Sequence, residues 1–320
     1  MLNRYLIALT LLLSAHAKTR DDFNSLADST YRKFDNTITL HMTHSPYGIN
    51  WESSSLNVIV NLAMNKYLFP DTKRSLGHVT VELNCTNKNG ESKRVISGQG
   101  AKSLDKLSHA LLKEGVGLSL VNRPSTNPHL PLITTTGKLE DENDLTPEYD
   151  QYLKRKKDKM AFLTYKVSPK SCQDMLHFYK KYKVVTEKTR DLETPLAGNV
   201  YGFGAEPTKF QGAGCATYAE AFFEVAGLLE HFKFYQEIYA TEKLIGNPDK
   251  YHHVSLGTLL LSKESISKPG KNKITLKFPD PDIMHKFVYE TNKNPKNVSH
   301  LLSYGSFGNK SKYVVIDLTK

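Results

Sequence analysis

The stretch GAGCATYAEAFF, residues 212–223, joins a glycine-bearing turn directly to a helix-forming segment. It places Cys215 at or near a helix N-terminus, where unpaired backbone N–H groups and the helix dipole favour the thiolate. The glycines on either side let the backbone bend tightly and let a ligand approach, which makes Gly214 a candidate substrate-binding residue. We interpret Cys215 as a candidate catalytic nucleophile. The alternative is a buried structural cysteine on a core helix.

Two further cysteines, Cys85 and Cys172, bear on this choice. In an exported protein a Cys85–Cys172 disulfide would leave Cys215 free, in line with a catalytic role. The sequence does not fix the pairing, and in a reducing compartment all three thiols would be free.

A cysteine nucleophile needs a base, and two histidines compete for this role. His78 opens the segment HVTVELN, residues 78–84, in which apolar and polar residues alternate as in a half-buried strand. His253, in YHHVSL at residues 251–256, is also predicted to begin a strand. We favour His78 because its strand pattern is clearer.

The residue that orients the base can be narrowed by hairpin geometry. If Asn89 and Gly90 form a two-residue turn, the strand of His78 pairs with residues 93–99, and Gln99 lies diagonal to His78 on the same face. Glu82 lies four positions along the strand from His78, about 13 Å away, too far for a direct bond. Gln99 is therefore the predicted orienting residue, provided that the register is correct.

The remaining sequence predicts an exported protein with one main domain. Residues 1–17 resemble a secretory signal, with Arg4, an apolar run and an Ala-His-Ala cleavage site. Residues 18–50 are polar and are expected to form a leader on the surface, before a single domain over residues 51–320. Four prolines and an acidic run predict an insertion or long loop around residues 122–158.

Composition restricts the partners. The formal net charge of +10 favours an anionic setting, such as a wall polymer, an anionic lipid surface or nucleic acid. The basic residues are scattered and no aromatic-interleaved basic motif occurs, so nucleic acid is not expected. No apolar run is long enough to span a membrane. Motifs for metals, phosphates and dinucleotides are missing, so neither a metal nor another cofactor is expected.

Three short motifs carry a family resemblance. Residues 77–82 (GHVTVE), 201–204 (YGFG) and 214–219 (GCATYA) resemble the NlpC-type papain-like cysteine peptidase superfamily. The order of His before Cys resembles its circularly permuted branch, which includes the lecithin–retinol acyltransferase-like proteins. Gly214 departs from the pattern, because Asn or Asp often precedes the cysteine there.

The resemblance implies an α+β protein with a permuted papain-like core, in which an antiparallel sheet bearing His78 packs on the helix bearing Cys215. Tyr201 would line the substrate site. The expected function is an exported thiol hydrolase that cleaves an amide bond in the cell envelope, such as one in a wall peptide. The alternatives are a thiol acyltransferase or lipase on membrane lipids, and a non-catalytic envelope binding protein with Cys215 buried.

Overall fold

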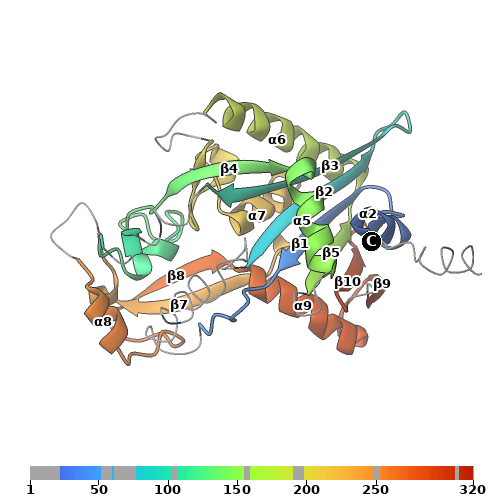
Figure 1. The fold of residues 1–320 in the computed structure, drawn as a ribbon. Helices are drawn as coiled ribbons and strands as arrows, with labels where there is room; N and C mark the ends of the chain where they lie inside the picture. Colours follow the sequence, from blue (N-terminus) through green and yellow to red (C-terminus); the bar gives the residue numbers. More distant parts are fainter. Residues whose placement is uncertain are drawn as a thin grey trace, which may run out of the picture.

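The computed structural model describes residues 22–51, 60, 77–102, 107, 109–111, 113–154, 159–189, 198–247, 253–306 and 310–319. The predicted signal segment lies outside these residues. Within them the protein is mixed α+β, with a large, mostly antiparallel sheet and a separate strand pair (Figure 1). No helix of this part of the chain is long and apolar enough to cross a membrane.

Eight strands form the main sheet in the order β6-β4-β3-β2-β1-β5-β10-β9. Neighbouring strands are antiparallel except for β5 and β10. The strands are β1 (Thr37–Thr43), β2 (His78–Thr86), β3 (Ser92–Ala101), β4 (Thr135–Asp141), β5 (Met160–Lys166), β6 (Val200–Tyr201), β9 (Leu301–Ser306) and β10 (Lys312–Asp317). The smaller pair is β7 (Tyr235–Thr241) with β8 (Lys273–Pro279).

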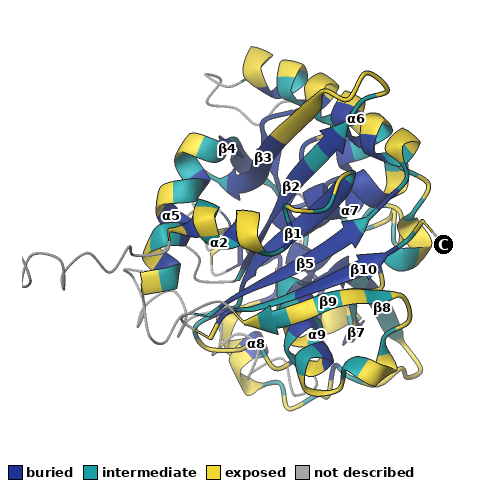
Figure 2. Cartoon of the chain, turned by 90° about the vertical axis from the view of Figure 1, so that its right-hand side faces the viewer, coloured by how far each residue is buried: buried dark blue, intermediate teal, exposed yellow. Residues whose placement is uncertain are grey.

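Helices cover both faces of the main sheet (Figure 2). The α-helices are α2 (Phe23–Ser29), α5 (Glu142–Lys154), α6 (Pro169–Lys188), α7 (Cys215–Val225), α8 (Leu256–Leu261) and α9 (Pro281–Lys293). Short 3-10 turns are η1 (Leu118–Val121), η2 (Pro207–Lys209), η3 (Leu229–His231), η4 (Glu242–Leu244) and η5 (Pro295–Asn297). Apolar residues of α6, α7 and α9 form one core with the sheet, and those of α2 and α5 form a second core on the opposite face.

A third core lies under the β7–β8 pair. It joins Trp51, Tyr201, η1 and α8 to these strands. Tyr201 thus belongs to this third core, whereas Cys215 belongs to the core of α6 and α7. The Tyr201 hydroxyl lies 3.9 Å from the Cys215 sulfur, so the two cores meet at these residues.

A disulfide joins Cys85 on β2 to Cys172 on α6, and Cys215 is free. This is the pairing that leaves the thiol of Cys215 outside a disulfide, as the role of nucleophile requires. The bridge closes a chain separation of 87 residues. It ties the main helix layer to the strand that begins with His78.

Two segments differ from the sequence-based expectation. Residues 37–43, expected in a surface leader, form the fully buried central strand β1. Its polar positions are buried as well, and Thr39 Oγ1 lies 2.9 Å from Thr164 Oγ1 of β5. The expected long loop contains β4 and α5, and Pro147 lies inside α5. As the sixth residue of α5, Pro147 removes one hydrogen bond to the Asn143 carbonyl oxygen but does not end the helix.

Candidate active site

Helix α7 begins at Cys215, as the sequence predicts. Gly214 is its N-cap, and the Gly214 N–H donates to Thr217 Oγ1 at 2.8 Å. Nine of its residues are buried, so α7 is a core element held in a fixed place. Its orientation is fixed further by Tyr218, whose hydroxyl lies 3.0 Å from Ser97 Oγ on β3.

Three groups surround the sulfur of Cys215. The side chain of His78 hydrogen-bonds the thiol, the backbone N–H of Val79 donates to it, and the Tyr201 hydroxyl lies 3.9 Å from Sγ. The ladder between β2 and β3 begins only at Thr80, so Val79 lies where the two strands separate. The structure therefore brings together Cys215, His78 and Tyr201 from three separate parts of the chain.

The electrostatics at Cys215 favour the thiolate. Burial alone would raise the pKa of the thiol, but His78, the Val79 N–H and the Tyr201 hydroxyl outweigh it, and the pKa lies below its ordinary value. The residue is only 6% exposed. A structural cysteine in apolar surroundings has a raised pKa instead. The burial agrees with the non-catalytic alternative, whereas the lowered pKa does not.

Glu140 is the orienting partner of His78. Its Oε2 lies 2.9 Å from His78 Nε2, and both side chains are largely buried. Glu140 extends from β4 across Gly98 of β3. A Cβ at Gly98 would lie 2.9 Å from Glu140 Oε2 and 2.6 Å from Thr80 Cγ2, so the carboxylate reaches the imidazole through space that only glycine leaves free.

The predicted orienting role of Gln99 is wrong, because the hairpin register differs by one residue. Thr80 pairs with Gly98, not with Gln99. The turn has three residues, with Gly90 at φ +81° and an Asn87 side chain that accepts from two backbone N–H groups. A one-residue slip exchanges the faces of a strand, so Gln99 lies on the α7 face, opposite to the face of Glu140.

Glu140 is not apparent as a site residue from the sequence, because it lies in the expected insertion around residues 122–158. The available signal was the segment TTGKLED, residues 135–141, which ends in acidic residues and pairs with β3 along residues 97–101. A carboxylate within an acidic run of a proline-rich region gives no indication that it faces a histidine far away in the sequence.

The other candidates fall in different places. His253 lies just before α8 and is not part of a strand, since Ser255 already caps that helix. The Nδ1 atom of His253 lies 2.8 Å from the Glu114 carbonyl oxygen. The expected strand at residues 253–261 is therefore wrong, and His253 is not the partner of Cys215. Gly214 packs its backbone against Gly202: a Cβ there would lie 2.8 Å from the Gly202 oxygen.

Several buried polar atoms around this end of the sheet make no hydrogen bond to any described residue. Thr43 of β1 lies opposite His78 of β2, and Thr135 of β4 lies opposite Tyr201 of β6. The Oγ1 atoms of both threonines have no hydrogen-bond partner among the described residues. Both amide atoms of Gln99 are also without partners among the described residues. Such groups cost free energy unless water or a ligand satisfies them.

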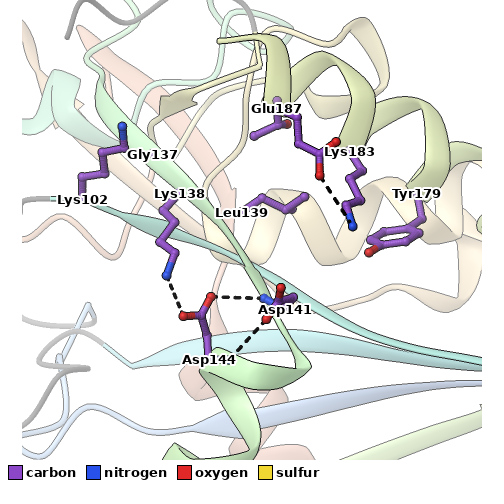
Figure 3. A pocket seen from close by; sticks show the side chains of 10 residues that line it. Lys102, Gly137, Lys138, Leu139, Asp141, Asp144, Tyr179, Lys183 and Glu187 are labelled. Atoms are coloured by element: carbon purple, nitrogen blue, oxygen red, sulfur yellow. Dashed lines mark hydrogen bonds and ion pairs between the residues drawn. The ribbon is translucent and has the colours of Figure 1, made fainter. Parts of the chain in front are cut away.

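A cavity of about 270 Å³ lies between β4 and α6 (Figure 3). Gly137 and Leu139 form part of its wall. Its charges are matched, as in the Lys138–Asp144 pair at 2.6 Å and the Lys183–Glu187 pair at 3.6 Å. The cavity does not include Cys215 in its lining, and its balanced charges favour neither an anion nor a cation.

Among the described residues, no group of three or more His, Cys, Asp or Glu side chains is arranged to hold a metal ion. Comparison with known proteins found no matching family model, no matching curated protein and no matching solved structure.

Proposed function

We propose that this protein is a thiol hydrolase that cleaves an amide bond through Cys215, with His78 as the base and Glu140 as the residue that orients it. The lowered pKa of the Cys215 thiol beside His78 carries this proposal. Glu140 at 2.9 Å from His78 Nε2 leaves Nδ1 as the nitrogen that exchanges a proton with the sulfur. This is the arrangement of nucleophile, base and orienting carboxylate that covalent catalysis requires.

The chemical steps follow from these positions. The Cys215 thiolate attacks the carbonyl carbon, and a carbon–sulfur bond forms while the carbonyl oxygen takes up the negative charge. The Cys215 N–H at the start of α7 is placed to donate to this oxygen. His78 gives its proton to the leaving amine, and water then hydrolyses the thioester with His78 again as base.

Chain order supports a permuted papain-like core as the finer description of the fold. His78 opens an antiparallel strand, and Cys215 opens a later helix that packs on β2. The resemblance of the sequence motifs to the NlpC-type superfamily is consistent with this order.

We further propose that the protein acts in the cell envelope. The signal-like residues 1–17, the Cys85–Cys172 disulfide and the net charge of +10 support export toward anionic material. A wall peptide is the proposed substrate, because it combines amide bonds with an anionic polymer.

The test is the release of new amino groups from purified wall fragments by the wild-type protein and the Cys215→Ala variant. The variant removes the nucleophile with little change in volume and should abolish release while its thermal unfolding stays the same. Binding to the fragments should weaken as salt rises. Cleavage of lipid esters but not of wall fragments would favour the acyltransferase alternative, and inactivity on both would favour the binding protein.

A further inference from the structure

Gln99 is a fully buried amide that the proposed reaction leaves unused. Its side chain is 0% exposed, and neither Nε2 nor Oε1 has a hydrogen-bond partner among the described residues. A buried unpaired polar atom costs about 1–3 kcal/mol. The described residues thus hold a buried donor and a buried acceptor that none of them satisfies.

The register places Gln99 on the face of β3 that α7 covers, toward the end of α7 that carries Cys215. Ser97, two residues earlier on the same face of β3, meets Tyr218 of α7 at 3.0 Å and pairs with Val81 of β2. One helical turn before Tyr218 is Cys215, whose sulfur accepts from the N–H of Val79. Ser97 therefore lies near Tyr218, and Gln99 lies farther along β3 in the same direction in which Cys215 lies from Tyr218 on α7.

The immediate neighbours of Gln99 connect it to the same site. A Cβ at Gly137 would lie 2.5 Å from Gln99 Nε2 and 3.2 Å from Tyr201 Cβ. The Tyr201 hydroxyl in turn lies 3.9 Å from Cys215 Sγ. Gln99 thus occupies the space that Gly137 leaves open, next to the tyrosine that contacts the nucleophile.

We propose that Gln99 binds an amide group of the substrate beside Cys215, with Nε2 donating to its carbonyl oxygen and Oε1 accepting from its N–H. This assignment rests on the proposed thiol chemistry and deepens it by naming the substrate class. An ester offers oxygen acceptors but no donor, so it leaves Oε1 unpaired in a buried site. Gln99 accordingly selects peptides over lipid esters.

Two small alkylating reagents test this without knowledge of the natural substrate. Iodoacetamide and methyl iodoacetate both form a carbon–sulfur bond to Cys215 with loss of iodide, but only the first carries an N–H donor. The measured quantity is the ratio of their rate constants at Cys215 in the intact protein, divided by the same ratio for N-acetylcysteine. We expect a value of about 5 to 10, from one net hydrogen bond.

The variants separate this role from packing. Gln99→Met keeps the volume but removes the donor and acceptor, so the normalised ratio should fall to about 1. Gly137→Ala should lower it as well, because its Cβ would occupy the place of Nε2. Lys93→Ala, at an exposed position of the same strand, is the control and should leave the ratio unchanged.

A normalised ratio near 1 in the wild-type protein, or an unchanged ratio in Gln99→Met, would overturn the assignment while leaving the thiol chemistry intact. If neither reagent reacted with Cys215 in the folded protein, the proposed function would fail, and the assignment with it.

Discussion

At the scale of single residues, the site depends on the contact between Glu140 and His78, which no local sequence pattern predicts. Glu140 reaches His78 only because Gly98 lies between them on the neighbouring strand. The two ends of the contact are 62 residues apart in the chain. The sequence identifies Cys215 and His78 as unusual through their flanking glycines, but it does not identify the carboxylate that supports them.

The variant Glu140→Gln removes the charge that stabilises the imidazolium form of His78. We expect kcat/KM to fall by about 100-fold, the usual effect of weakened acid–base catalysis. The pH at which the Cys215 thiolate forms should rise. Glu142→Gln is the matched control, since Glu142 is 41% exposed and pairs with Arg94 at the surface; an equal loss of activity in both variants would contradict the assigned role.

The variant Gly98→Ala tests the same contact from the backbone side. Its Cβ would push Glu140 Oε2 and Thr80 Cγ2 apart, at a cost of about 1–3 kcal/mol in stability. Activity should fall further than this stability loss explains, because His78 loses its partner. Gly48→Ala, where a Cβ meets no atom within 4 Å, is the control. Chemical denaturation together with activity measures both effects, and full activity in Gly98→Ala would contradict the account.

At the scale of elements, the strands and helices with clear periodicity were predictable and their pairing was not. The start of α7 and the strand at residues 78–84 follow from glycine placement and alternation. The hairpin register was missed because Asn87 organises a three-residue turn in place of the two-residue turn that Asn-Gly favours. Strand β1 does alternate apolar and polar residues, but its polar face is buried among partners that only tertiary structure supplies.

The disulfide between β2 and α6 should contribute strongly to stability. For a separation of 87 residues, loss of chain entropy in the unfolded state predicts about 4.6 kcal/mol. The double variant Cys85→Ala/Cys172→Ala should lower the free energy of unfolding by this order, measured by urea denaturation. Cys215→Ala leaves the bridge intact and should unfold near the wild-type midpoint. Equal midpoints for all three proteins would show that the bridge adds nothing.

At the scale of the whole molecule, a buried charge network fastens the N-terminal segment to the sheet. Arg32 donates to both oxygens of Glu82, at 2.5 and 3.1 Å, and Glu82 also contacts His41 at 3.2 Å. Burial lowers the pKa of His41, so it is neutral near pH 7 and Arg32 is the counter-charge. Burial would raise the pKa of Glu82, but His41 and Arg32 outweigh it and lower the pKa below 4.5.

The pH dependence of stability follows from the direction of the Glu82 shift. A carboxylate with a lowered folded pKa contributes stability fully above its ordinary value of 4.5, and this contribution disappears as the pH falls through the folded pKa. Glu82→Gln should therefore lower the free energy of unfolding at neutral pH by about 3–5 kcal/mol, since Arg32 loses its buried carboxylate partner and keeps only the exposed one, Asp28. It should also flatten the acid limb of the stability curve. Glu91→Gln, on the exposed hairpin, should keep the wild-type curve, and a steep acid limb in Glu82→Gln would contradict the assignment.

The central claim is that His78 holds Cys215 as a thiolate in the folded protein. The most direct measurement is the rate of Cys215 alkylation by iodoacetamide against pH, followed by mass spectrometry of the native protein. The account predicts that the rate stays high well below the ordinary thiol pKa of 9.0, and that His78→Ala returns the profile to that of an ordinary thiol. A wild-type rate that rises about tenfold per pH unit toward that value, or labelling only after denaturation, would contradict it.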